Sequence, residues 1–409
     1  MKAISKFTLV TFIYTCCVLS GCNILKIAKY SNQEEYIFKH EFSKFNFYED
    51  QILINTKISD KLIVDMLFDL GAGASAIFPD SEFYAVISKY SPITSPGKSV
   101  SADGLKMRNH FYRLGDIDTK WFSIKNSLIS ANNRPNIYSC DKVKGLWGAG
   151  SFAPSFKGKG NKIVIMNIQD TTLAILDSIP SLKDWQILET KYDKISSVFY
   201  IRASLGSESF YFLFDTGFNG NVVMTRSDYE IAKTNSGTFS NEQMAFGYIS
   251  NSLSGTQIDT LKIAYSSLSI DGLIRLDSIP IYSTKSVAFN VIGMELIKRF
   301  NVLVDYQNHK LYFQINPNFK KTEPTFYKAK GFSPRNTINS GFCIQNILSD
   351  SPAEKAGLKV GDKIISINNI SAETGDICEI EKIFRKLDGK STNNKIIVRR
   401  GNDILSFIL

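Results

Sequence analysis

Two aspartates, each separated from a glycine by one residue, are the residues of this chain whose type and spacing point most directly to chemistry. Asp69 lies in Leu-Phe-Asp-Leu-Gly at residues 67–71, and Asp215 lies in Leu-Phe-Asp-Thr-Gly at residues 213–217. Two carboxylates about 3 Å apart share one proton, because like charges that close cannot both ionise. Such a pair supplies a base that activates water and an acid that protonates a carbonyl oxygen. The alternative interpretation is that each aspartate only caps a turn that closes a strand.

The histidine content argues against other common hydrolytic chemistries. The chain has three histidines, His40, His110 and His309, and none has a second histidine or a cysteine at metal-ligand spacing. A zinc hydrolase needs such ligands, and serine or cysteine hydrolases need a histidine base beside the nucleophile. The sequence therefore predicts no metal and no cofactor.

The composition is typical of a globular, β-rich chain with more than one domain. A chain of 409 residues is too long for one ordinary core, and a hydrophobic content of 44% argues against disorder. The formal charge of +9 is spread without a block of like charges. We therefore expect a solvated, lysine-rich surface rather than a nucleic-acid partner. Cys140, Cys343 and Cys378 form no framework pattern, so we expect them to be small buried hydrophobes.

The second half of the chain repeats the first at a shift of 146 residues, which is the separation of the two aspartates. Residues 52–54 align with residues 198–200 as apolar strands, and each copy then turns into the strand that ends at its aspartate. Gly148 follows the first aspartate by 79 residues, and Gly293 follows the second by 78. Each copy closes with a predicted strand pair, 162–167 with 172–176 and 301–305 with 310–313. Self-similarity over this distance indicates duplicated structural units.

These motifs resemble the pepsin and retropepsin superfamily of aspartic proteases over about residues 34–316. The resemblance implies a mainly β fold with two retropepsin-like β-barrel lobes, at 34–180 and 181–316, related by a pseudo-twofold axis. Each lobe of the family supplies one Asp-Thr/Ser-Gly loop, and a later segment of two apolar residues and a glycine packs beneath it. The implied activity is endopeptidase cleavage of a peptide or protein substrate.

The resemblance also assigns the site residues. Asp69 and Asp215 match the catalytic dyad, and Gly71 and Gly217 allow the sharp backbone turns that bring the carboxylates together. The positions that the resemblance places in support of the dyad are Leu70, Gly71, Thr216, Gly217, Gly148 and Gly293.

One position departs from the family pattern. The family has threonine or serine after each aspartate, and its hydroxyl hydrogen-bonds across to the opposite loop. Thr216 fits this pattern and Leu70 does not. A buried group left without a hydrogen-bond partner costs roughly 1–3 kcal/mol. The alternative function is therefore a weak or inactive pseudoprotease that binds peptides as an envelope lipoprotein.

Residues 101–104 read Ser-Ala-Asp-Gly, which favours a hairpin turn. The resemblance suggests a hairpin that covers the cleft of the first lobe, but the tip lacks the tyrosine that pepsins have there. We therefore expect a plain surface hairpin, and a covering hairpin is the alternative.

The C-terminal region resembles a bacterial PDZ domain, which has an α+β fold. Residues 351–369 carry the resemblance: Ser-Pro opens a short helix, Gly357 ends it, and a Gly-Asp turn leads into an apolar-alternating strand. We expect a linker at 317–326, the PDZ domain at 327–409 and its second helix at 379–387. PDZ domains bind a C-terminal or extended peptide between a sheet edge and this helix. The resemblance makes residues 330–332 the carboxylate loop, with Gly331 and Phe332 in the peptide-binding site.

The N-terminus has the features of an export signal. Lys2 and Lys6 precede an apolar run at 7–19, which ends in Leu-Ser-Gly-Cys at 19–22. This ending resembles the bacterial lipobox, which implies a signal peptide at 1–21, acylation of Cys22 and a tether at 22–33. An ordinary signal peptide that happens to hold a cysteine is the alternative. With asparagine rather than aspartate after the cysteine, the resemblance implies an exported lipoprotein of the Gram-negative outer membrane, held to the membrane by its lipid alone.

Overall fold

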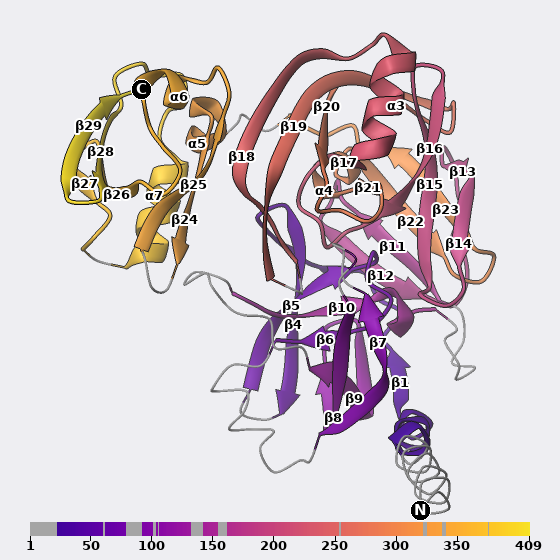
Figure 1. Ribbon diagram of the computed structural model, residues 1–409. Coiled ribbons are helices and arrows are strands. Elements are labelled where there is room, and N and C mark those ends of the chain that lie inside the picture. The colour runs from indigo at the N-terminus through magenta and orange to yellow at the C-terminus, as the bar shows by residue number, and fades with distance from the viewer. Residues whose placement is uncertain are drawn as a thin grey trace, which may run out of the picture.

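The computed structural model is mainly β, which confirms the predicted fold class. It describes residues 23–59, 62–78, 92–100, 104, 106–131, 142–153, 162–252, 255–321, 325–337, 341–374 and 376–409. The predicted signal peptide, Cys22 and residues 101–103 of the predicted hairpin turn lie outside these ranges. Within them, no helix is both long and apolar enough to cross a membrane. Figure 1 shows a first lobe in indigo and purple, a second lobe in magenta to orange, and a C-terminal unit in orange to yellow.

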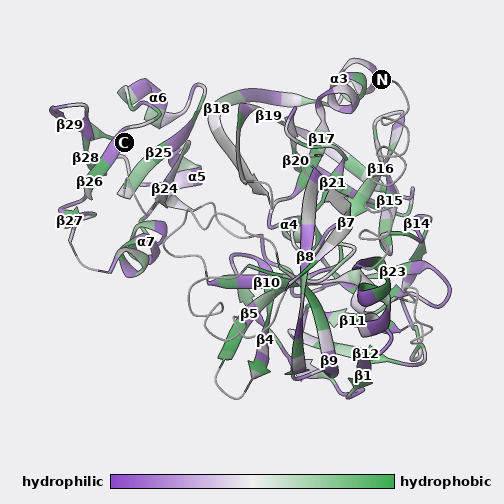
Figure 2. Cartoon of the chain, turned by 60° about the horizontal axis from the view of Figure 1, so that its bottom comes forward, coloured by the Kyte–Doolittle hydropathy of each residue, from purple (hydrophilic) through white to green (hydrophobic). Residues whose placement is uncertain are grey.

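Six strands of the first lobe close into a barrel. They are β4 (Gln51–Ser59), β5 (Leu62–Asp69), β6 (Ala76–Ile77), β8 (Lys106–Asp118), β9 (Phe122–Ala131) and β10 (Val143–Gly148). Their order around the barrel is β4-β5-β10-β6-β9-β8, and β8 pairs back to β4. The β5–β10 and β6–β9 pairs are parallel and the others antiparallel. Alternating apolar side chains of β5 face the core, and the hydrophobic stretches of β4, β5 and β9 are visible in Figure 2.

Six strands of the second lobe close in the same way. They are β15 (Val198–Leu205), β16 (Glu208–Phe214), β17 (Val222–Thr225), β19 (Gly255–Ile270), β20 (Ile274–Thr284) and β21 (Val291–Ile292). Their order is β15-β16-β21-β17-β20-β19, and β19 pairs back to β15. The β16–β21 and β17–β20 pairs are parallel, at the positions that match those of the first barrel. The two barrels thus share one strand order, as expected for a duplicated unit.

Each lobe carries two further hairpins, which involve β3 (Asn46–Tyr48), β7 (Ile93–Val100), β14 (Thr190–Asp193) and β18 (Ser240–Ser252). We call β3–β4 and β14–β15 the short hairpins, and β7–β8 and β18–β19 the long hairpins. The remaining elements of the two lobes are β1 (Glu35–Phe38), η1 (Ala149–Ser151), α3 (Arg226–Ser236) and α4 (Met294–Ile297).

A six-stranded sheet joins the two lobes. Its order is β13 (Gln186–Leu188), β23 (Lys310–Ile315), β22 (Phe300–Asp305), β11 (Ile163–Asn167), β12 (Thr172–Leu176) and β2 (Ser43–Lys44). The two strand pairs predicted to close the repeats are confirmed as β11–β12 and β22–β23. Strands β11 and β22 also pair with each other, with Val164 opposite Val304. Because one apolar cluster runs through both barrels and this sheet, the two lobes form a continuous core.

The C-terminal unit has its own core and the elements expected of it. They are α5 (Phe326–Lys330), β24 (Phe332–Thr337), β25 (Gly341–Leu348), α6 (Pro352–Ala356), β26 (Lys363–Ile367), β27 (Ile370–Ser371), α7 (Ile377–Arg385), β28 (Lys395–Arg400) and β29 (Asp403–Ile408). The predicted start and end of α6 are confirmed: Ser351 caps its first turn, and Gly357 ends it with a φ of 92°.

The predicted second helix needs two corrections. It begins at Ile377 rather than residue 379, because the Asp376 side chain accepts hydrogen bonds from two amides of the first turn and sets the start. It also ends two residues early, at Arg385. Within the helix, Ile383 is 44% exposed, whereas Phe384 is fully buried.

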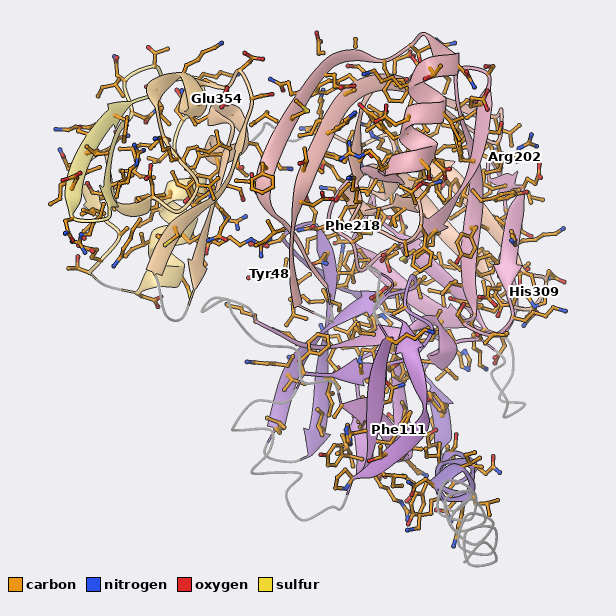
Figure 3. The ribbon with its side chains drawn as sticks, viewed as in Figure 1. Tyr48, Phe111, Arg202, Phe218, His309 and Glu354 are labelled. Carbon is orange, nitrogen blue, oxygen red and sulfur yellow. The ribbon has the colours of Figure 1, made fainter. Side chains whose placement is uncertain are left out.

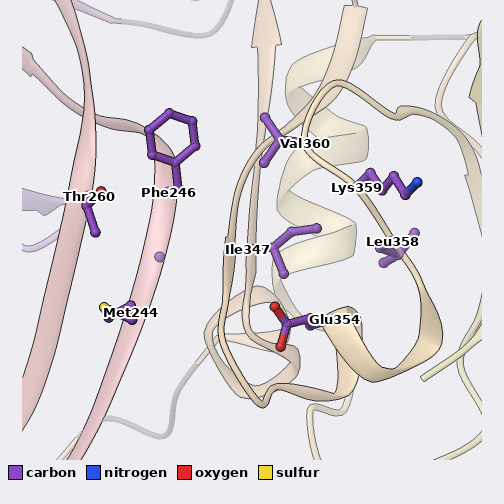
Figure 4. A pocket seen from close by; sticks show the side chains of 9 residues that line it. Met244, Phe246, Thr260, Ile347, Glu354, Leu358, Lys359 and Val360 are labelled. Atoms are coloured by element: carbon purple, nitrogen blue, oxygen red, sulfur yellow. The ribbon is translucent and has the colours of Figure 1, made fainter.

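The C-terminal unit is joined to the second lobe by β-sheet pairing. Strand β18 pairs antiparallel with the end of β25, with Phe246 opposite Ile347 and Gly247 opposite Asn346. Gly247 has a φ of 136°, and a Cβ atom there would lie 2.0 Å from the carbonyl oxygen of Gln345. Only glycine allows this approach. A cavity of about 370 Å³ lies beside the junction, between β18 and α6, and Phe246 lines it from the side of the lobe (Figure 4).

The cysteine expectation is wrong for Cys378. This residue, in the first turn of α7, is disulfide-bonded to a cysteine outside the described residues. Cys343 is a free thiol, and partial burial raises its pKa. A single sequence offers spacing but not proximity, so an isolated pair of cysteines left no pattern to recognise.

Candidate active site

The two aspartates lie at equivalent ends of equivalent strands. Asp69 is the last residue of β5 and stands beside Gly148 of the parallel strand β10. Asp215 follows the last residue of β16, and its amide donates to the carbonyl of Ile292 in the parallel strand β21 at 3.0 Å. The barrels therefore present each aspartate where its strand ends beside the later apolar-apolar-glycine segment of the same lobe.

The structure brings the two predicted dyad residues together. The carboxyl groups of Asp69 and Asp215 hydrogen-bond to each other. Oδ1 of Asp69 also accepts from the amides of Gly71 and Ala72, at 3.0 and 2.9 Å. Oδ1 of Asp215 accepts from the amides of the matching residues of its own loop, at 2.8 and 3.0 Å. Both aspartates keep partial solvent exposure although the residues before them are buried, which leaves the pair accessible.

Burial and mutual repulsion act on the acidity of the pair. The pKa of Asp69 is raised well above its ordinary value, first by desolvation and then by the charge of Asp215. The pKa of Asp215 is also raised by desolvation, although amide hydrogen bonds to its carboxylate oppose this. Because the two groups exchange a hydrogen bond, their proton belongs to the pair. One member can then act as an acid while the other acts as a base.

Each predicted glycine makes room for the opposite carboxyl group. A Cβ atom at Gly71 would lie 2.5 Å from Cγ of Asp215. A Cβ atom at Gly217 would lie 2.3 Å from Cγ of Asp69. Real Cβ atoms do not approach other atoms so closely, so any larger residue pushes the two loops apart. The glycine requirement is therefore mutual across the two lobes.

Half of the expected cross-loop hydrogen bonding is present. Oγ1 of Thr216 donates to the carbonyl of Phe68 at 2.6 Å and accepts from the amide of Leu70 at 2.8 Å. The Leu70 side chain is 2% exposed and packs in the shared core. It has no donor or acceptor for the reciprocal contacts with the second loop. The two loops are thus tied by the hydroxyl of one threonine.

The apolar-apolar-glycine segments that end at Gly148 and Gly293 contact the two Asp-x-Gly loops closely. The Gly148 amide donates to Oγ of Ser75 at 3.0 Å, and a Cβ atom at Gly148 would lie 2.6 Å from the carbonyl carbon of Ala74. The Gly293 amide donates to the carbonyl of Asn221 at 2.8 Å. Ser75 was not singled out in the sequence, where a serine in a run of small residues carries no distinctive signal.

The long hairpin of the first lobe leans toward the second lobe. A Cβ atom at Gly104 would lie 3.5 Å from Cβ of Ala288, which belongs to the other lobe. This contact favours a covering hairpin over a plain surface hairpin. Sequence reasoning missed the corresponding hairpin of the second lobe, β18–β19, although the repeat placed it at a similar distance after Asp215.

A further residue at the site was also missed. The side-chain amide of Gln51 donates to the carbonyl of Gly217, inside the loop that carries Asp215. Gln51 directly precedes the first aligned strand at residues 52–54, and this position alone does not indicate a contact with Gly217. The next residue, Phe218, donates its backbone N–H to Asp215. It lies where the two lobes meet in Figure 3.

The predicted PDZ loop residues lie at the start of β24. Gly331 ends α5 with a φ of 79°, and a Cβ atom there would lie 2.1 Å from Cβ of Ser351. Phe332 is buried and packs edge-on against Tyr327. Within the described residues, β24 pairs with β25 and with no other strand.

Comparison with known proteins identifies the C-terminal unit. A family model described as PDZ domain matches residues 344–397, and this unit is a PDZ domain. Among curated proteins, none matches the chain. Among solved structures, conglutin gamma, described as a unique basic 7S globulin from lupine seeds, aligns with a TM-score of 0.42. That alignment has 10% sequence identity and covers 69% of this chain and 95% of the other.

Proposed function

We propose that this chain is an aspartic endopeptidase that hydrolyses peptide bonds with water activated between Asp69 and Asp215. The observation that carries the proposal is the pair of carboxyl groups, hydrogen-bonded to each other across two loops that close equivalent barrels. Two aspartates that only capped turns would have no reason to face each other or to require glycine in the opposite loop. Their raised pKa values add support, because groups with such shifts gather at catalytic sites.

The chemistry follows from the shared proton. The ionised member of the pair removes a proton from water, whose oxygen attacks the carbonyl carbon of the substrate. The protonated member donates its proton to the carbonyl oxygen, so that the tetrahedral intermediate forms without a separated charge. The member that took the proton from water then gives it to the amide nitrogen, while the other member takes a proton from a hydroxyl of the intermediate, and the C–N bond breaks. Before the reaction the pair holds one proton, because desolvation and the neighbouring charge raise the pKa of Asp69.

The PDZ domain gives the protease a second peptide-binding surface. Its β24 edge and α7 are the elements between which PDZ domains hold a C-terminal or extended peptide. We propose that this groove holds a substrate tail or a partner peptide.

We further propose that the chain is exported and anchored by a lipid at Cys22, at the outer membrane of a Gram-negative cell. The residues that support this are those of the leader, Lys2, Lys6 and the Leu-Ser-Gly-Cys ending. The disulfide at Cys378 agrees with this location, because disulfides persist in oxidising compartments outside the cytosol.

Cleavage of a pool of internally quenched peptides tests the enzymatic proposal. The mature chain, assayed from pH 3 to 8, should cleave members of the pool. A metal chelator and serine-directed inhibitors should leave the rate unchanged, whereas a peptide with a hydroxyl-bearing tetrahedral carbon at the scissile position should inhibit it. A rate that depends on the chelator or on serine modification contradicts the proposed mechanism.

Leu70 favours a second candidate, a peptide-binding pseudoprotease. Its side chain cannot return the cross-loop hydrogen bonds that Thr216 makes. This alternative predicts that the same pool binds in the cleft and is not cleaved at any pH. Binding without turnover, measured by calorimetry beside the cleavage assay, separates the two functions.

A further inference from the structure

The turn of the short hairpin in the first lobe is tightly constrained. It joins β3 to β4 through Glu49 and Asp50, whose φ angles are 49° and 69°, and Tyr48 pairs with Gln51 across it. Two consecutive positive φ angles define the tight turn that suits the twist of a hairpin. A turn of this kind holds its side chains in fixed directions. Tyr48 lies between the first lobe and the PDZ domain in Figure 3.

Three consecutive residues of this turn contact three different parts of the chain. Oε1 of Glu49 lies 3.0 Å from Nη2 of Arg385, at the C-terminal end of the PDZ helix α7. Asp50 forms an ion pair with Lys298, directly after α4 of the second lobe. The third residue, Gln51, donates to the carbonyl of Gly217 in the catalytic loop. A single short turn thus connects the PDZ domain to the loop that carries Asp215.

Gly217 is the residue through which such a contact can affect the dyad. Its amide donates to Oδ1 of Asp215 at 2.8 Å, and its Cα faces Cγ of Asp69. The carbonyl that Gln51 binds belongs to the peptide group between Gly217 and Phe218, and the N–H of that same group donates to Oδ1 of Asp215 at 3.0 Å. A rotation of this peptide therefore changes the distance between the two carboxyl groups, which must remain close to share a proton.

The second lobe has the matching turn, but within the described part of the chain this turn has no ion pair with the PDZ domain like that of Glu49 with Arg385. The turn between β14 and β15 packs on the opposite catalytic loop, since a Cβ atom at Gly73 would lie 2.6 Å from the carbonyl oxygen of Ser196. Its side chains bond within the turn: Oγ of Ser196 donates to Asp193 at 2.7 Å. Packing on the opposite loop is therefore common to both short hairpins, whereas the ion pair with Arg385 extends only the first one to the PDZ domain.

A second ion pair also joins the PDZ domain to the second lobe. Nζ of Lys328, in α5, lies 3.6 Å from Oε2 of Glu295, in α4. Helix α5 leads directly into Gly331 and the predicted carboxylate loop. The PDZ domain thus contacts the two lobes through α5 and α7 as well as through β25.

We propose that Gln51 is a positioning residue for the dyad, and that the ion pair of Glu49 with Arg385 makes this positioning depend on the docked PDZ domain. This inference rests on the proposed endopeptidase function. When α7 is in place, the turn is fixed and Gln51 holds the Gly217 peptide in the orientation that brings the carboxyl groups together. When α7 moves, the turn is freed and turnover falls. The PDZ domain then controls the active site as well as binding a peptide.

Variants of the full mature chain test the proposal with two measurements. Gln51→Leu removes the donor and should lower kcat about fivefold with little change in KM, the loss expected for one hydrogen bond. Arg385→Gln and Glu49→Gln should each lower kcat about threefold, and their double variant should lose no more than either single variant. Arg385→Lys keeps the charge and should recover most of the rate. Hydrogen exchange at the amides of Gly217 and Phe218 should become faster in the Gln51, Glu49 and Arg385→Gln variants.

The chain offers a matched control on the same helix. Lys382→Gln breaks the exposed pair of Lys382 with Glu379, which does not reach the turn, and should change neither kcat nor exchange. If Arg385→Gln behaves like Lys382→Gln in both measurements, the proposal is wrong. If wild type shows no turnover at all, the endopeptidase proposal fails. In that case faster exchange at Gly217 in Arg385→Gln still supports the link, and unchanged exchange overturns it.

Discussion

The side-chain hydroxyl of Thr216 bonds to the backbone of Leu70 in the other lobe, whereas the Leu70 side chain has no polar atom with which to bond back. The Thr216 hydroxyl accepts the Leu70 amide at 2.8 Å and donates to the carbonyl of Phe68 at 2.6 Å. The two Asp-x-Gly loops have matching strands, glycines and aspartates, but only the second loop supplies a side-chain hydroxyl to the contact between them.

Replacing Leu70 by threonine should restore the second half of this contact. The new hydroxyl can bond across to the Asp215 loop, and a net gain on the order of 1 kcal/mol corresponds to a several-fold rise in turnover. Because threonine is smaller than leucine, the change also leaves a void in a buried site. Thermal unfolding measured beside peptide cleavage separates the two effects. A stable variant that cleaves no faster than wild type shows that the missing hydroxyl does not limit the enzyme.

The raised pKa of Asp69 predicts a stability change that is opposite in sign to the activity change. A carboxyl group with a folded-state pKa above its unfolded value binds its proton more tightly in the folded state. The stability that Asp69 contributes is therefore fully present below its unfolded-state pKa of about 4. It is lost as the pH rises through the folded-state pKa. Asp69→Asn removes this loss, so Tm at pH 7 should rise by about 3 °C.

The same comparison at pH 3 provides the control for this prediction. There Asp69 is protonated in both states, and the two proteins should unfold at nearly equal temperatures. An Asp69→Asn variant that is less stable than wild type at pH 7 would show that the carboxyl group is not under strain in the folded protein.

Gly247 should be required for the docking of the PDZ domain on β18. Gly247→Ala places a Cβ atom 2.0 Å from the carbonyl oxygen of Gln345, so β18 and β25 must separate. Hydrogen exchange should become faster at residues 245–247 and 346–348. Gly272→Ala is the matched control, because Gly272 also has a positive φ but has no atom within 4 Å of its added Cβ. Equal exchange in the two variants would place the effect in backbone strain rather than in the contact.

The leader and the disulfide can be tested together. With Cys343 free, the partner of Cys378 is one of Cys16, Cys17, Cys22 and Cys140. Cleavage before an acylated Cys22 removes two of these and occupies the third, so a lipoprotein leaves Cys140. Mass spectrometry of the mature, non-reduced chain should find Cys22 acylated and a peptide that joins Cys140 to Cys378. A soluble chain without palmitate label, or a disulfide that includes Cys22, rules out the lipid anchor.

The sequence predicted the parts of this fold that follow from local pattern and repetition. Matched apolar strands ending in Asp-x-Gly predicted two alike lobes, and capping residues such as Ser351 and Gly357 predicted α6. The sequence did not predict that β11 pairs with β22, because a strand made of a continuous apolar run can pair with many other strands. The boundaries of α7 were displaced by two residues because Asp376 was not recognised as its cap.

The residues of the candidate active site were also predicted only in part. Asp69 and Asp215 were found from their spacing, because chemistry limits which residue types can serve. Gln51 and the β18–β25 contact were missed, since one hydrogen bond to a carbonyl and one close backbone approach leave no composition signal. Such contacts between distant segments depend on how the three units pack, which a single sequence does not record.

The central claim is most directly tested by the turnover of Asp69→Asn, Asp215→Asn and the double variant on one identified cleavable peptide. Asparagine keeps the size of the side chain, but an amide can neither take nor give the shared proton. Each single variant should lose about 10³-fold or more in kcat while it remains folded, and the double variant should lose no more than the worse single variant. A folded double variant that still cleaves the peptide at the wild-type rate would contradict the account.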